Sequence, residues 1–186
     1  TNSYTPGKTS VTVTKAWNDK NNQDGLRPGS IQVQLYADGK AVGEAIDLTE
    51  NKDWTYTWSD LDQKASGKTI VYTVKELTAV KGYTTSIDDS EQGNVVITNN
   101  HTPETTAIKG TKIWNDKDNQ DGKRPDTITV NLLADGKAVD SKEVTSTDGW
   151  TYEFTNLPKY QNGQLINYTV TENEVSDYST TIDGTN

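Results

Sequence analysis

The sequence contains no cysteine and no methionine, and only one histidine and one phenylalanine among its 186 residues. Without cysteine, a disulfide framework and a thiolate metal site are excluded. Hydrophobic residues make up 31% of the chain and the mean hydropathy is −0.83, so a domain of this composition buries a thin core. We therefore expect something other than burial or disulfides to help hold the fold.

Positive charge is also scarce, with 18 basic against 27 acidic residues and a net charge of −9. This balance argues against nucleic acid or an anionic membrane as a partner, and we attribute it to solubility. No hydrophobic run is long enough to span a membrane, and the first residues lack the charged and apolar segments of a signal peptide. We expect an excised fragment or the interior of a mature protein.

The strongest positive pattern is an internal repeat. Five motifs occur in both halves: KAWNDK (15–20) and KIWNDK (112–117), NQDGLRP (22–28) and NQDGKRP (119–125), ADGKAV (37–42 and 134–139), WTY (54–56 and 150–152), and YTVKE (72–76) and YTVTE (168–172). The first two motifs return at an offset of 97 residues. The chain is therefore predicted to contain two copies of one fold.

Each copy has the period-two alternation of half-buried β-strands. In the first copy this pattern predicts strands over 11–17, 31–36, 54–58, 70–76 and 95–99. Asp38-Gly39 and Asp135-Gly136 are typical of hairpin turns, and no segment reads as a helix. We predict an all-β protein of two tandem antiparallel β-sandwich modules, immunoglobulin-like or prealbumin-like.

The module boundaries follow from the repeat. TNSYTP at 1–6 matches TNNHTP at 98–103, so residues 1–8 are interpreted as the tail of a preceding repeat and a linker. The first module covers 9–102 and the second 103–186, which stops before the counterpart of the last strand and is expected to lack it. Because an open sheet edge leaves backbone groups unpaired, we expect the start of a following module, or the Asn2 segment of a neighbouring copy, to fill this gap.

The repeated motifs resemble those of the B-type repeat domains of the staphylococcal collagen adhesin and related cell-wall-anchored proteins. The resemblance covers nearly the whole chain and rests on Thr-Lys-x-Trp followed by Asn-Asp, Asn-Gln-Asp-Gly-x-Arg-Pro, Trp-Thr-Tyr, Tyr-Thr-Val-x-Glu, and Ile-Thr-Asn before Thr-Pro. It implies an extracellular stalk module without enzymatic turnover, whose partners are neighbouring repeats. The parent adhesin is expected to bind host matrix such as collagen through another domain.

The resemblance also implies a spontaneous isopeptide bond between a lysine on the first strand and an asparagine on the last, assisted by a buried acid. The matching residues are Lys15, Asn99 and Glu76. Strand alternation places all three on the apolar face of their strands. Desolvation there favours the neutral amine and a protonated acid that can polarise the Asn99 amide carbonyl. The amine attacks this carbonyl, Glu76 transfers the proton, and ammonia leaves.

An ordinary ion pair between the lysine and the glutamate is the alternative that spacing alone favours. In the second module Lys112 and Glu172 match the pattern, but the counterpart of Asn99 is missing. Asn186 falls a few residues short of that position and is a substitute candidate. No completed bond is expected there.

The remaining motifs predict neither a cofactor nor a metal site. Residues 19–25 superficially resemble a calcium loop, but the glycine comes one position late and Ser30 stands where a glutamate is required. We interpret the segment as a turn and leave weak calcium binding open. His101 is interpreted as a linker residue. The five tryptophans are spaced as core or cross-strand residues rather than as a sugar-binding platform.

Two other functions remain open at this stage. A module of this kind could itself bind matrix protein, for example by adding a strand at an open sheet edge. It could also be a pilus shaft subunit, although no polymerisation motif or sorting signal is recognised. Near-duplication of the loops favours the structural stalk, because a dedicated binding site would not need to be copied.

Overall fold

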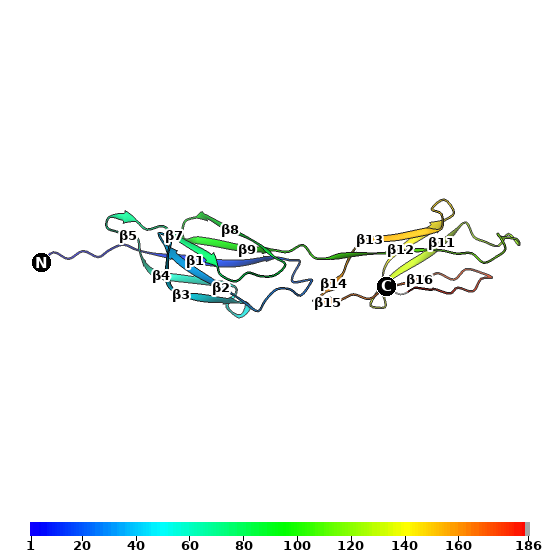
Figure 1. Cartoon of the computed structure of the whole chain (residues 1–186), viewed down its shortest axis with the longest axis horizontal. Coiled ribbons are helices and arrows are strands. Elements are labelled where there is room, and N and C mark those ends of the chain that lie inside the picture. The colour runs from blue at the N-terminus through cyan, green and yellow to red at the C-terminus, as the bar shows by residue number, and fades with distance from the viewer. Residues whose placement is uncertain (185–186) are drawn as a thin grey trace. The chain divides into compact units, whose positions relative to one another are not determined.

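A computed structural model describes residues 1–184 and divides the chain into two units, the first ending at Thr102 and the second beginning at Pro103. The predicted all-β fold is confirmed, because strands account for nearly all of the regular structure in both units (Figure 1). The only helical element among the described residues is one 3-10 turn, Glu50–Lys52. No helix in residues 1–184 is long and apolar enough to cross a membrane.

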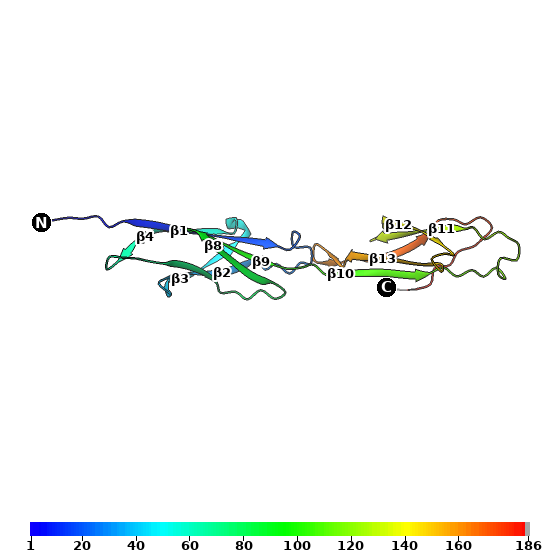
Figure 2. The ribbon, with the colours of Figure 1, turned by 90° about the horizontal axis from the view of Figure 1, so that it is seen from above.

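The first unit is a sandwich of a four-stranded and a three-stranded sheet, in the orders β4-β1-β9-β8 and β3-β2-β7. Its strands are β1 (Lys8–Asn18), β2 (Ser30–Ala37), β3 (Lys40–Thr49), β4 (Thr55–Asp62), β7 (Tyr72–Glu76), β8 (Thr84–Glu91) and β9 (Asn94–Asn100), with a small hairpin of β5 (Lys64–Ala65) and β6 (Lys68–Thr69). β1 and β9 run parallel, side by side (Figure 2), whereas the other pairings are antiparallel.

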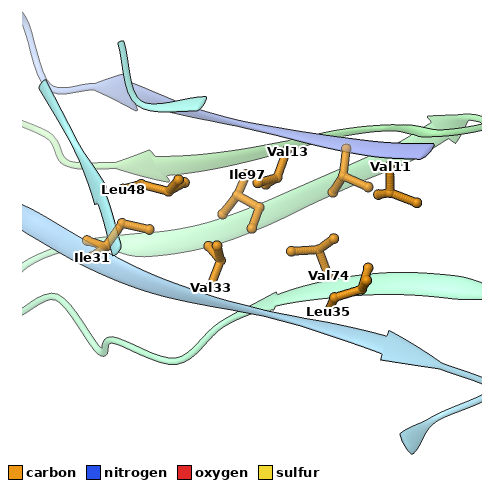
Figure 3. Close-up of a cluster of buried hydrophobic side chains, with 9 residues drawn as sticks. Val11, Val13, Ile31, Val33, Leu35, Leu48, Val74 and Ile97 are labelled. Atoms are coloured by element: carbon orange, nitrogen blue, oxygen red, sulfur yellow. The ribbon is translucent and has the colours of Figure 1, made fainter. Parts of the chain in front are cut away.

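The core of the first unit lies between the two sheets and follows from the alternation of the strands. Its buried members are Val11, Val13, Ile31, Val33, Leu35, Leu48, Val74, Val95 and Ile97. Figure 3 shows these side chains directed toward one another between the strands. Burying each contributes about 1.5–3 kcal/mol before entropy is counted, and the list is short. The core is thin, as the composition indicates.

The second unit repeats the three-stranded sheet, in the order β12-β11-β16, and pairs β10 with β13. Its strands are β10 (Thr105–Thr111), β11 (Thr127–Ala134), β12 (Lys137–Thr145), β13 (Thr151–Pro158) and β16 (Tyr168–Glu172), with a small hairpin of β14 (Tyr160–Gln161) and β15 (Gln164–Leu165). Within residues 103–184, β10 is hydrogen-bonded to β13 on one side only, whereas its counterpart β1 has a strand on both sides.

The repeated Asn-Asp loop is a turn closed by a buried carboxylate. Asp19 accepts hydrogen bonds from the backbone of Asn22 at 2.9 Å, from Arg27 Nη2 at 2.6 Å and from the hydroxyl of Tyr83 at 2.8 Å. Burial alone would raise the pKa of Asp19, but these hydrogen bonds outweigh it and lower the pKa to about 2. Asp116 and Arg124 repeat the arrangement in the second unit. The repeated loop motif therefore has a structural role, which is to hold the turn closed.

Candidate functional site

The side chains of Lys15, Glu76 and Asn99 meet in the interior of the first unit. They come from β1, β7 and β9, so the cluster joins both sheets. The side chain of Lys15 is 0% exposed and that of Glu76 is 3% exposed, and Asn99 is 0% exposed. Because alternation along β1 and β9 directs Val13 and Ile97 into the core, the polar side chain two residues further along each strand is also buried.

The three side chains are arranged around the carboxyl group of Glu76. Asn99 Nδ2 donates a hydrogen bond to Glu76 Oε1 at 3.0 Å. Lys15 Nζ lies 3.4 Å from Glu76 Oε2, and this oxygen accepts no hydrogen bond from the described residues. The amine reaches the backbone oxygens of Ala16 and Ile97 only at 3.4 and 3.5 Å. The lysine is therefore buried without a short hydrogen bond to a described residue.

This environment disfavours the charged form of Lys15. Burial lowers the pKa of Lys15 from 10.5 to about 8, although Glu76 attracts the ammonium and opposes the shift. The amine also lies 4.4 Å from the ring centre of Trp17. This cation–π contact stabilises the ammonium form and so opposes part of the effect of burial. With a pKa of about 8, a minor fraction of the amine is neutral near neutral pH, and that fraction has a free lone pair.

Chemically, the cluster contains the parts of an acyl transfer. A neutral lysine amine is a nucleophile, a primary amide is an acyl donor, and a carboxyl group in contact with both can move a proton between them. All three are held away from water, so little solvent competes with the amine for the amide.

In the second unit the structure brings Lys112 and Glu172 together as a close ion pair. Lys112 Nζ lies 3.0 Å from Glu172 Oε1 and 2.9 Å from Oε2. Their side chains are 14% and 7% exposed, more than those of the first pair. Glu172 Oε1 also accepts a hydrogen bond from the hydroxyl of Thr180 at 2.8 Å. The candidate Asn186 lies outside the described residues.

Sequence reasoning missed one side chain that touches the cluster. The hydroxyl of Thr85, on β8, donates a hydrogen bond to Asn99 Oδ1 at 2.8 Å. The eight residues of β8 are all exposed, so no hydrophobic alternation predicts this strand. The repeat contains a usable signal, since YTTSID at 83–88 returns as YSTTID at 178–183.

His101 is also more than a linker residue. Its ring contacts the backbone oxygen of Gly82 through Nδ1 and the carboxylate of Asp24 through Nε2, both at 2.8 Å. The hydrogen bond with Asp24 raises the pKa of His101 above its usual 6.5, against the opposing effect of burial. Across residues 1–184, no three His, Cys, Asp or Glu side chains are grouped so that they could hold a metal ion.

The sandwich and its repeated motifs correspond to a known domain family. The family model of the Cna protein B-type domain matches residues 11–100 and 108–186, and the chain belongs to this family. This confirms the family that the sequence motifs indicate.

Two staphylococcal relatives show the same correspondence over the full chain. A collagen adhesin of Staphylococcus aureus is 60% identical over 185 residues, covering 100% of this chain, which spans 16% of that relative's length. The crystal structure of two B repeat units (B1B2) of the collagen binding protein (Cna) of Staphylococcus aureus is 58% identical. It has a TM-score of 0.92 and covers 98% of this chain and 49% of its own. The chain is thus homologous to the B repeats of a collagen adhesin.

Proposed function

We propose that this chain is a structural stalk repeat of a Gram-positive cell-wall-anchored adhesin, stiffened by an intramolecular isopeptide bond between Lys15 and Asn99. The proposal is carried by the buried cluster of Lys15, Glu76 and Asn99, which links the first and last strands of the first unit. The protein is exported, its partners are neighbouring repeats, and the parent adhesin binds host matrix such as collagen through another domain. Homology to a collagen adhesin supports these points.

The bond forms by one acyl transfer within the folded protein. The ammonium of Lys15 first gives a proton to Glu76, and the neutral amine attacks Cγ of Asn99. The new C–N bond produces a tetrahedral centre with negative charge on Oδ1. Glu76 then carries a proton from the attacking nitrogen to Nδ2, and ammonia leaves. The product is a lysine–asparagine amide, and the step occurs once per chain.

The consequence is mechanical as well as thermodynamic. The bond closes a loop of about 84 residues, and by the chain-entropy relation for disulfides it stabilises the unit by about 4–5 kcal/mol. Since β1 begins the unit and β9 ends it, a pull on the two ends passes through the covalent bond. The loop between them is not extended. A cysteine-free module with a thin core gains resistance to force and proteolysis in this way.

Intact mass spectrometry tests the proposal. We expect the wild-type chain to be lighter than its sequence mass by one ammonia for the first unit, and a tryptic digest to contain a branched peptide joining Lys15 to Asn99. Lys15→Ala and Glu76→Ala should each restore the full mass. Lys8→Ala is the matched control, because Lys8 lies on the same strand with a side chain 46% exposed, and it should leave the ammonia loss unchanged. A wild-type chain of unaltered mass would leave only the ion pair.

A further inference from the structure

We propose that Thr85 is a catalytic residue of the bond-forming reaction, because its hydroxyl donates a hydrogen bond to the amide oxygen of Asn99 that becomes negatively charged during attack. This inference rests on the proposed function. Thr85 Oγ1 lies 2.8 Å from Asn99 Oδ1, while Asn99 Nδ2 donates to Glu76 Oε1 at 3.0 Å. Both ends of the amide therefore have a separate partner.

The position of the hydroxyl is set by the sheet. β8 pairs antiparallel with β9, and Thr85 lies directly opposite Asn99 in the register. Directly opposed residues place their side chains on the same face of a sheet, close together. Because Asn99 is fully buried, its amide oxygen needs a partner within the protein, and Thr85 supplies it before the reaction begins.

This preorganised donor matches the change of charge in the reaction. As Lys15 Nζ bonds to Cγ of Asn99, the C=O double bond opens and its electron pair moves onto Oδ1. A donor that already points at this oxygen binds the tetrahedral state more strongly than the neutral amide. When Nδ2 leaves as ammonia, the pair returns to re-form the carbonyl, and the Thr85 hydroxyl keeps its own proton throughout.

The second unit contains the same hydroxyl at the same place in the repeat. Thr180 occupies the position of Thr85 in the YSTTID motif, and it donates to Glu172 Oε1 at 2.8 Å. The hydroxyl is thus directed at the lysine–glutamate cluster in both units. In the first unit it meets the amide oxygen, and in the second it meets the carboxylate itself.

The experiment compares bond formation in Thr85→Val, Thr85→Ala and Thr85→Ser with the wild type. Full-length chains are assembled by peptide ligation in denaturant, so that they have never folded and no bond has formed, and are then refolded by dilution. Tryptophan fluorescence follows folding, and intact mass follows the loss of ammonia from chains that have already folded. We expect Thr85→Val and Thr85→Ala to lose ammonia about 100-fold more slowly than the wild type, as for loss of one oxyanion donor. Thr85→Ser keeps a hydroxyl and should react within a few-fold of the wild type.

Thr84→Val is the matched control, because Thr84 precedes Thr85 on β8 and pairs with Asn100 instead; its rate should be unchanged. If folded Thr85→Val and Thr85→Ala react at the wild-type rate, the proposal is wrong. Failure of both to regain native fluorescence would also overturn it, since Thr85 would then act in folding. If the wild type loses no ammonia, it is the isopeptide proposal itself that fails.

Discussion

The two units contain the same lysine and glutamate but hold them differently. In the first unit Asn99 donates a hydrogen bond to Oε1 of Glu76, and Lys15 Nζ lies 3.4 Å from Oε2. In the second unit Lys112 lies within 3.0 Å of both oxygens of Glu172. A short contact to both oxygens stabilises a charged pair, whereas burial with long contacts favours the neutral amine. The two pairs thus differ in whether an amide shares the carboxylate, and the isopeptide proposal depends on that amide.

The largest expected effect comes from removing that amide. Asn99→Ala should give the first unit a lysine–glutamate pair like that of the second unit, and prevent the bond. We expect the free energy of unfolding of the first unit to fall by about 4–5 kcal/mol. We also expect its dependence on urea to become steeper, because an unfolded chain without the crosslink exposes more surface. Urea unfolding with pulsed hydrogen exchange, with peptides of each unit measured separately, provides both quantities.

Glu172→Gln in the second unit is the control for this comparison. It breaks an ion pair but no covalent bond, so stability should fall while the urea dependence of the second unit stays the same. The result that contradicts the crosslink is an Asn99→Ala chain whose first unit unfolds with the wild-type urea dependence. The loss of stability would then reflect two broken hydrogen bonds and a cavity.

A second difference between the units lies where β1 pairs with β4 and where β10 pairs with β13. Val13 is fully buried opposite Tyr56, which is 37% exposed. In the second unit Gly110 pairs with Tyr152, and a Cβ added to Gly110 would clash with the Tyr152 hydroxyl oxygen. The phenol thus fills the space that a valine side chain occupies in the first unit.

Gly110→Val tests whether the Tyr152 ring fills the space that the Val13 side chain fills in the first unit. Overpacking should lower the stability of the second unit by about 2 kcal/mol, unless Tyr152 moves outward. The double variant Gly110→Val/Tyr152→Ala should recover part of the loss, because the clash is gone; thermal unfolding of the chain with near-UV circular dichroism measures both. Equal destabilisation by Gly110→Val in the presence and absence of the Tyr152 ring would show that the ring does not fill this space.

The sequence was sufficient for the features that depend on local pattern. Alternation and the repeat predict the strands of the core and place Lys15, Glu76 and Asn99 on apolar faces, and the structure brings these three side chains together. The sequence does not predict β8, because an exposed strand has no hydrophobic alternation. Thr85 lies on this strand, so its contact with Asn99 is not predicted either. The parallel pairing of β1 with β9 was also not predicted, since alternation defines the faces of a strand but not its neighbour.

The smallest effect concerns His101, whose partners are also distant in sequence. The chain has no second histidine, so only the first unit has this contact. Both ring nitrogens face acceptors, the backbone oxygen of Gly82 and the carboxylate of Asp24. Neutral imidazole has one N–H, so only the doubly protonated ring donates to both. The charged and titratable groups around it are Asp24, Asp19 and Tyr83.

The pH dependence of stability follows from this geometry. The pKa of His101 is raised above 6.5 in the folded state, so its contribution is fully present below that pH and is lost as the pH rises through the folded pKa. We expect the first unit to lose about 1 kcal/mol between about pH 5.5 and pH 8.5, the value of one hydrogen bond, while the second unit changes less. Urea unfolding of each unit at several pH values measures this difference, and His101→Gln should abolish it. A difference that persists in His101→Gln would assign the pH dependence to another group.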